Sequence, residues 1–229
     1  MKRTIVMILL GLAANAVAMH VHVRVMVQVI EVPHAELTKW STGEKLGGAE
    51  LHERAVKLAL DGGAEILDTN VVIGRSGEKA VIESFAEVIY STESDDGGPA
   101  IPVDPKQMPQ PLRPYDFVSF ETRNAGTTME IYPAIGRDGF IDLRLAYEMV
   151  DRDSLVTWME FRDEWGNSPV RRPIFETKRV GSAIAVVPGK FELFNVFTPK
   201  PAAVPAVVTR QLVFVRCDLL KSGTENEDE

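Results

Sequence analysis

The chain contains a single cysteine, Cys217, among its 229 residues. One cysteine cannot form an intrachain disulfide, so the fold must be held together by core packing and strand pairing. Because Cys217 alternates with Val213 and Val215 in a strand-like run, we expect a buried and unreactive thiol at this position.

Positive charge is also scarce. The 25 lysines and arginines are outnumbered by 33 acidic residues, which gives a formal charge of −8 and an isoelectric point near 5.2. A protein that binds nucleic acid through its phosphates needs a basic surface, so the composition argues against this class of partner. With 45% hydrophobic and 25% charged residues, it also excludes disordered and collagen-like chains.

The short motifs of common enzymes are missing. There is no Gly-x-Ser-x-Gly, His-Glu-x-x-His or Cys-x-x-Cys, and no glycine-rich loop that would cradle a phosphate. His20 and His22 fall on the same face of one expected strand and could approach a shared metal, but no third ligand accompanies them. We therefore expect no enzymatic activity, no cofactor and no small-molecule substrate. A metal site at these two histidines is the weaker alternative.

The N-terminal apolar run is short, extending from Ile5 to Ala14 between Lys2-Arg3 and the small residues Ala16-Val17-Ala18. This order is typical of a secretory signal peptide, and the run is shorter than the roughly 20 residues needed to span a bilayer. We predict cleavage after Ala18, with an uncleaved anchor as the alternative. The chain is therefore expected to be exported.

The predicted organisation has three parts. Residues 1–18 form the signal peptide, residues 19–221 form a single β domain, and residues 222–229 form an acidic, disordered tail. No linker composition divides the middle part.

Apolar and polar residues alternate with a period of two through much of the middle part, starting at its first residues. Between His20 and Val32, valines occupy every odd position from 21 to 29, which predicts a long strand with one face in a core. The apolar spacing predicts one helix near residues 49–60, packed against a sheet rather than a membrane. Nine or ten strands are expected in total, and the first and last strands are expected to be neighbours.

Turn residues divide these strands. Gly74-Arg75-Ser76-Gly77 and Gly136-Arg137-Asp138-Gly139 each predict a hairpin, and Pro188-Gly189 predicts a further turn. Six prolines between Thr92 and Pro114 predict a surface loop, with contact to a partner as the sharper alternative. The fold class is therefore mainly β (α+β), with long antiparallel or mixed strands and one early helix.

The segment from Gly126 to Leu143 carries the most specific pattern. It reads Gly-Thr-Thr-Met, alternates to Pro133, and turns at Asp138-Gly139. This resembles the core of the secretin family, the outer-membrane channel proteins of type II and type III secretion and type IV pilus systems. The segment from Ala64 to Ala80 is similar to a family hairpin, with Asp68 and Asn70 where Ser and Pro are usual.

The resemblance continues in order along the chain, with the lead strand at Val27–Val32, a late segment at Pro173–Gly189 and a closing strand at Leu212–Val215. The residues that carry the family motifs are Gly126, Thr127, Thr128, Pro133, Asp138, Gly139, Thr177, Arg179 and Gly189. The resemblance implies a mainly-β domain whose copies pair side by side into a ring and make a gated barrel. It also implies that residues 79–117 correspond to the gate, and that the protein is located in the periplasm or outer membrane of a Gram-negative-type bacterium.

Two functions follow from this resemblance. The first is an exported component of, or partner to, an outer-membrane secretion or pilus channel, either as a homo-oligomer or bound to other channel components. The second is a stand-alone periplasmic structural or adaptor domain that forms no pore. The second is favoured where the chain departs from the family, as at Phe191–Phe194, which stands in place of the usual Leu-Gly-Gly-Leu.

Overall fold

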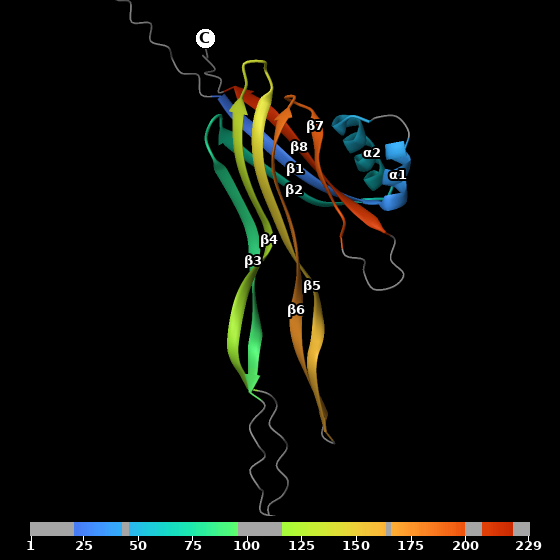
Figure 1. The fold of residues 1–229 in the computed structure, drawn as a ribbon, viewed down its shortest axis with the longest axis vertical. Helices are drawn as coiled ribbons and strands as arrows, with labels where there is room; N and C mark the ends of the chain where they lie inside the picture. Colours follow the sequence, from blue (N-terminus) through green and yellow to red (C-terminus); the bar gives the residue numbers. More distant parts are fainter. Residues whose placement is uncertain (1–20, 43–45, 96–115, 164–165, 200–207, 222–229) are drawn as a thin grey trace, which may run out of the picture.

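The computed structural model describes residues 21–42, 46–95, 116–163, 166–199 and 208–221 (Figure 1). The predicted signal peptide, the acidic tail and most of the proline-rich loop lie outside the described residues, and so does His20 of the suggested metal pair. These expectations therefore stay predictions. Within the described ranges no group of three His, Cys, Asp or Glu residues is arranged to hold a metal.

The first and last strands lie side by side, as predicted. β1 (Val21–Pro33) pairs with β8 (Thr209–Lys221) over its whole length, and the sheet continues to β2 (Glu65–Arg75) on one side and β7 (Phe191–Phe197) on the other. All neighbours are antiparallel. We call this four-stranded sheet, in the order β2-β1-β8-β7, sheet A.

The central segments form a second four-stranded sheet of longer strands, which we call sheet B. Its order is β3 (Ala80–Asp95), β4 (Asp116–Ile135), β5 (Ile141–Asp163) and β6 (Gly166–Val186), again antiparallel throughout. These pairings confirm the predicted mainly-β fold of long strands. Gly136–Gly139 joins β4 to β5 in a tight hairpin, as expected.

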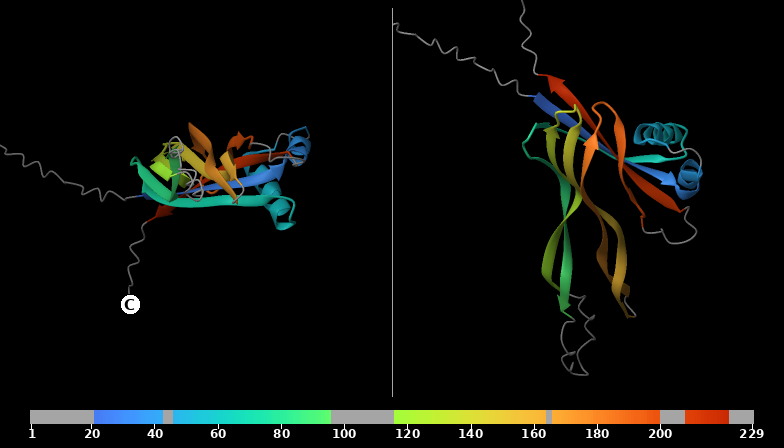
Figure 2. Two further views of the ribbon diagram at one scale, coloured as in Figure 1. Left: turned by 90° about the horizontal axis from the view of Figure 1, so that it is seen from below. Right: turned by 45° about the horizontal axis from the view of Figure 1, so that its top comes forward.

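Sheet A lies between two apolar layers. On one side, the odd-numbered valines of β1 and residues of β8 pack against Ile131, Leu143 and Leu145 of sheet B. On the other side, Ile30, Val32, Leu212 and Phe214 pack under the helices. The upper part of the molecule is therefore a layer of helices on a two-sheet sandwich (Figures 1 and 2).

The described residues contain two helices where one was predicted. α2 (Gly48–Leu60) matches the expected helix and buries Leu51 and Ala55 against sheet A. A side chain at Gly48 would meet the backbone of Glu192 and Leu193 at 2.6 Å, so this glycine lets α2 approach β7 closely.

The additional helix, α1 (His34–Thr42), has no fully buried residue and is rich in serine and threonine. The hydroxyls of Thr38, Ser41 and Thr42 donate to main-chain carbonyls one turn earlier, a local bonding pattern that lowers helix propensity. Only Leu37 and Trp40 pack on the core beneath it. The apolar spacing that identified α2 is therefore absent from α1.

Three predictions about the strands and the loop were wrong. The turn at Gly74–Gly77 does not close a hairpin, because β2 pairs with β1 while β3 pairs with β4 in the other sheet. The described residues contain eight strands instead of the expected nine or ten, because β4 and β5 are single continuous strands of 20 and 23 residues. Residues 92–95, which were expected to lie in the proline-rich loop, belong instead to β3, which continues to Asp95.

Sheet B divides below the sandwich. The β4–β5 pairing ends at Gly126 and Val150, which we call the fork. Beyond it, β3 and β4 continue as one arm (residues 85–95 and 116–125), and β5 and β6 continue as another (residues 151–163 and 166–176). Figure 1 shows the two arms extending away from sheet A, each with its strands crossing.

Candidate assembly surface

Both outer strands of sheet B leave one edge without a strand neighbour among the described residues. β3 pairs only with β4, and β6 pairs only with β5. Because four antiparallel strands alternate in direction, β3 and β6 run in opposite directions. The β6 edge of one copy could therefore pair with the β3 edge of another and continue the same antiparallel pattern.

The arms expose large apolar side chains. On the β3–β4 arm these are Phe85, Ile89 and Phe120, and on the β5–β6 arm they are Leu155, Trp158, Met159 and Ile174. Ile89 is 67% exposed and Trp158 is 62% exposed. An apolar surface beside an open strand edge is the combination that native proteins avoid unless a partner covers it.

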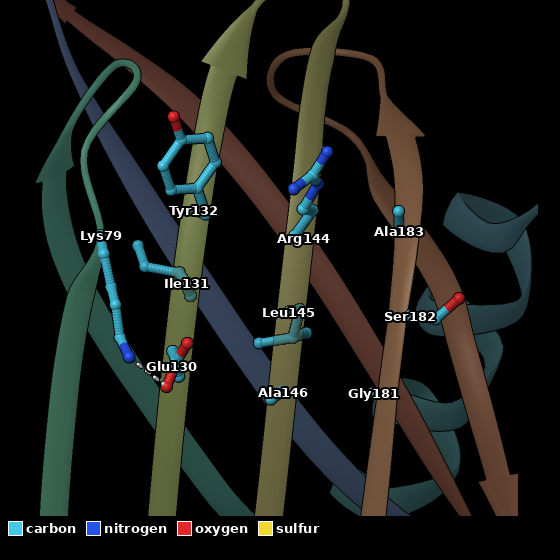
Figure 3. A pocket seen from close by; sticks show the side chains of 10 residues that line it. All are labelled: Lys79, Glu130, Ile131, Tyr132, Arg144, Leu145, Ala146, Gly181, Ser182 and Ala183. Atoms are coloured by element: carbon cyan, nitrogen blue, oxygen red, sulfur yellow. Dashed lines mark ion pairs between the residues drawn. The ribbon is translucent and has the colours of Figure 1, made fainter.

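The outer face of the upper part of sheet B carries a shallow groove of about 410 Å³ (Figure 3). At its sides, Lys79 pairs with Glu130 at 2.7 Å, and the Arg144 guanidinium lies 5.9 Å from the ring centre of Tyr132. The floor is formed partly by the small residues Ala146 and Gly181. Lys79 and Glu130 thus neutralise each other at one side of the groove.

The fork depends on Gly126. Its φ of 146° lies in a region that residues with side chains rarely adopt, and an added Cβ would come within 2.2 Å of the Ser84 carbonyl oxygen. Glycine thus allows β4 to pass close to β3 at the point where it leaves β5.

A polar cluster lies beside the fork, where the sandwich ends. One carboxylate oxygen of Asp68, on β2, accepts hydrogen bonds from Asn70 (2.7 Å), Thr127 (2.9 Å) and the Tyr147 hydroxyl (2.8 Å). Burial and, next, the bond to Asp68 raise the pKa of Tyr147, so the hydroxyl stays a donor at neutral pH. The cluster ties sheet A to both inner strands of sheet B.

A buried lysine lies near this cluster. Lys178, on β6, is 7% exposed, and its ammonium lies 3.1 Å from Asp151 and 3.3 Å from Glu176. Two acidic partners compensate for removing one positive charge from water. The apolar core therefore gives way to a polar layer where the arms begin.

The structure brings five of the predicted motif residues together at the fork. Gly126 and Thr177 share one rung of sheet B through Val150, and Thr128 and Arg179 share another through Glu148. Thr127 lies on the rung between them and binds Asp68.

The functional groups of Thr177 and Arg179 are also engaged. The Thr177 hydroxyl accepts a hydrogen bond from Arg123 at 2.8 Å. Arg179 makes a two-pronged ion pair with Glu148 at 2.8 and 2.9 Å.

The other four motif residues lie away from the fork, near the opposite end of sheet B. Pro133 lies on β4 just beyond the part of this strand that pairs with β3, so its missing N–H removes no hydrogen bond between the two strands. Its carbonyl accepts a hydrogen bond from the Gly77 N–H at 2.7 Å. Asp138 accepts from the Phe140 N–H and Gly139 has a φ of 84°, as their turn requires. Gly189 turns the chain between β6 and β7 with a φ of 83°.

No family model matches the chain, and no curated protein matches it. The Salmonella SPI-1 type III secretion injectisome secretin InvG aligns over 91% of this chain and 66% of its own, with 12% identity and a TM-score of 0.45. The chain is similar to secretins. The V. cholerae type IV competence pilus secretin PilQ gives 88% and 61% coverage, 11% identity and a TM-score of 0.43.

A third similar structure is the type II secretin GspD of enteropathogenic Escherichia coli, with 89% and 70% coverage, 10% identity and a TM-score of 0.44. These secretins belong to the family that the sequence motifs resemble. The chain spans less than two thirds of the length of InvG. At these identities the activities of the secretins do not transfer to it.

Sequence reasoning identified the secretin-like motif residues but missed the polar cluster around them. Asp68 was noted only as a departure from the secretin pattern, and Tyr147 and Lys178 were not singled out. The sequence signal that could have identified them is a polar residue on the core face of an otherwise apolar strand. Tyr147 and Lys178 each lie two positions from an apolar residue that packs in the core. Neither described helix has the length and apolar character needed to cross a bilayer.

Proposed function

We propose that this protein is an exported subunit of a ring-shaped secretion or pilus channel in the outer membrane. The observation that carries this proposal is the pair of open, oppositely directed edges of sheet B, flanked by exposed apolar side chains. The ordered secretin motifs, which place five of their residues at the fork, support it further. The role is architectural and uses no catalytic group.

The geometry of the edges supports ring assembly. Contacts between unlike surfaces, β6 of one copy with β3 of the next, generate a closed ring when the rotation between copies closes. Each contact would satisfy main-chain donors and acceptors along an edge strand and would cover apolar side chains such as Ile89. Other channel components are the remaining expected partners.

The second candidate is a stand-alone periplasmic structural or adaptor domain. One observation favours it: β3 and β6 of the same copy contact each other in the arms, so the edges are not wholly free. In this case the protein would remain a monomer whatever its surroundings.

Light scattering on size-exclusion fractions of residues 19–229, in buffer and in detergent, separates the two candidates. The channel proposal predicts a large oligomer in detergent that appears as rings by electron microscopy. A strict monomer at high concentration in both conditions would contradict it.

A charged substitution on the edge strand β3 tests the proposed assembly surface more directly. Ile89→Lys places a charge on the exposed face of β3 and is expected to abolish the oligomer. The matched control is Leu60→Lys, which changes an 83% exposed leucine at the end of α2 and should leave assembly unchanged. Equal behaviour of the two variants would argue against sheet B as the assembly surface.

A further inference from the structure

The two edge strands of sheet B contact each other below the fork, although they lie at opposite ends of the sheet order. Above the fork, β4 and β5 separate β3 from β6. Below it, the strands of each arm cross, as two views of the ribbon show (Figures 1 and 2). The crossing turns part of β3 toward part of β6.

An aromatic pair forms the first part of this contact. The rings of Tyr90, on β3, and Phe175, on β6, have centres 5.6 Å apart. The guanidinium of Arg123, on β4, lies 4.9 Å from the centre of the Phe175 ring and donates to the Thr177 hydroxyl. The two ring contacts join one arm to the other, and the hydrogen bond joins the β3–β4 arm to the fork.

An arginine on β6 forms the second part. The Arg172 guanidinium donates through Nη2 to the main-chain carbonyl of Thr92, on β3, and its centre lies 5.2 Å from that of the Trp158 ring. The acceptor belongs to the backbone of an edge strand. A side chain of one edge strand thus occupies a backbone group of the other.

The contact is small and incompletely satisfied. Nε of Arg172 is buried and has no hydrogen-bond partner among the described residues. A buried donor without an acceptor costs free energy, so part of what the Nη2 bond contributes is lost. Few residues join β3 to β6 compared with the continuous ladders within each arm. The arms can therefore part without loss of strand pairing.

We propose that this contact, formed by Tyr90, Arg123, Arg172 and Phe175, is an autoinhibitory cap that shields the β3 and β6 edges of a single copy until a second copy replaces it. The proposal rests on the proposed function, because it assumes that these two edges pair between copies. Native sheets commonly protect their edges with charged or twisted segments. Here each edge would protect the other, and assembly would begin with separation of the arms.

Removing the cap should accelerate assembly. The double variant Arg172→Ala, Phe175→Ala loses both the carbonyl contact and the aromatic pair. We expect its rate of oligomer formation after transfer into detergent to rise about tenfold, equivalent to about 1.4 kcal/mol in the barrier. The matched control is Arg144→Ala, which removes an arginine from an aromatic ring on an inner strand of sheet B and should leave the rate unchanged.

Holding the cap closed should have the opposite effect. Tyr90→Cys with Phe175→Cys, bridged by a short bismaleimide, is expected to stay monomeric, while each single variant treated alike should assemble. The native thiol does not interfere, because Cys217 is buried and burial raises its pKa to about 12. The cross-linking experiment also tests the cap if the alanine variants fold poorly.

The outcomes separate the cap from the proposed function. If the wild-type protein assembles while the alanine variant is no faster and the bridged variant assembles equally well, the cap is wrong and the channel proposal stands. If neither the wild-type protein nor the uncapped variant assembles, both are overturned. A wild-type protein that forms rings slowly, with an uncapped variant that forms them faster, would support both.

Discussion

The upper and lower halves of sheet B are made from the same four strands, yet their apolar side chains differ in how far they are buried. In the upper half, one face of β5 is covered by sheet A, and Leu145 is 2% exposed. In the lower half, the same strand continues without a covering sheet, and Leu155 is 57% exposed. An apolar strand face that its own chain leaves uncovered is a candidate for a partner.

The polar layer at the fork marks the border between the two halves. Asp68, Tyr147 and Lys178 occupy positions where the apolar core would otherwise continue into the arms. Buried polar groups with fixed partners specify one arrangement more sharply than apolar packing does. The fork therefore fixes where the sandwich stops and the arms begin.

The largest expected difference between the halves is in the cost of truncating a leucine of β5. Leu145→Ala should lower the free energy of unfolding by about 3 kcal/mol, since it leaves a cavity in the core. Leu155→Ala should change it by less than about 0.5 kcal/mol in the monomer, because the side chain is mostly in solvent. Urea denaturation of both variants tests this, and similar losses would show that the arm is packed like the core.

The border itself should be sensitive to a single methyl group. Gly126→Ala forces a side chain against the Ser84 carbonyl in a left-handed backbone conformation, and we expect a loss of about 2 kcal/mol. Gly181→Ala is the control, since Gly181 has open space around its Cβ position. A tolerated Gly126→Ala, measured by the same denaturation, would mean that the fork can relax.

The polar layer should contribute less than the core. Tyr147→Phe removes one donor to Asp68 while keeping the ring, and it should cost about 1 kcal/mol. Tyr132→Phe, which alters an exposed hydroxyl on the outer face of sheet B, should be nearly neutral. If the two variants lose stability equally, the hydrogen bond to Asp68 does not help to join the sheets.

The helix-covered face of sheet A should respond to acid, with an effect no larger than that of the polar layer. His52, on α2, stacks on Phe191 with ring centres 3.6 Å apart, and burial followed by repulsion from Arg216 lowers its pKa from 6.5 to about 4. The unfolded chain then binds the proton more readily, so stability is complete above pH 6.5 and falls as the pH drops toward 4.

For this half-buried ring we expect a loss of about 1 kcal/mol over that window, after allowance for solvent screening. Urea midpoints at pH 7 and pH 4.5 measure it. His52→Gln should lose this contribution, and His22→Gln should retain it. An unchanged pH dependence in His52→Gln would assign the acid sensitivity to other groups.

Much of the sandwich could be predicted from sequence because its signals are local. The valine alternation gave β1 its buried face, and Gly136–Gly139 gave the β4–β5 turn. The assignment of β3 to a different sheet from β2 could not be predicted. A four-residue turn has the same kind of sequence whether the two strands that it connects pair with each other or belong to different sheets. The position of the fork could not be predicted either, because the sequences of β4 and β5 do not indicate at which residues their pairing ends.

The candidate site was predicted in part. The motif residues Gly126, Thr127 and Thr177 were identified by resemblance, and the structure places them on neighbouring rungs. The contacts that give them context come from distant segments, such as Asp68 on β2 and Arg172 on the far arm. Such pairings depend on how the sheets stack and twist, which a pattern along one strand does not encode.

The pairing of Val21 with Lys221 places the two ends of the described fold at one corner, far from the tips of the arms. A short linker between them would join the ends, and the chain could instead be opened at the Gly136–Gly139 turn. Such a circular permutant keeps every strand pairing in both sheets. A passenger domain fused directly to Val21 or to Lys221 would likewise be carried at that one corner, clear of both arms.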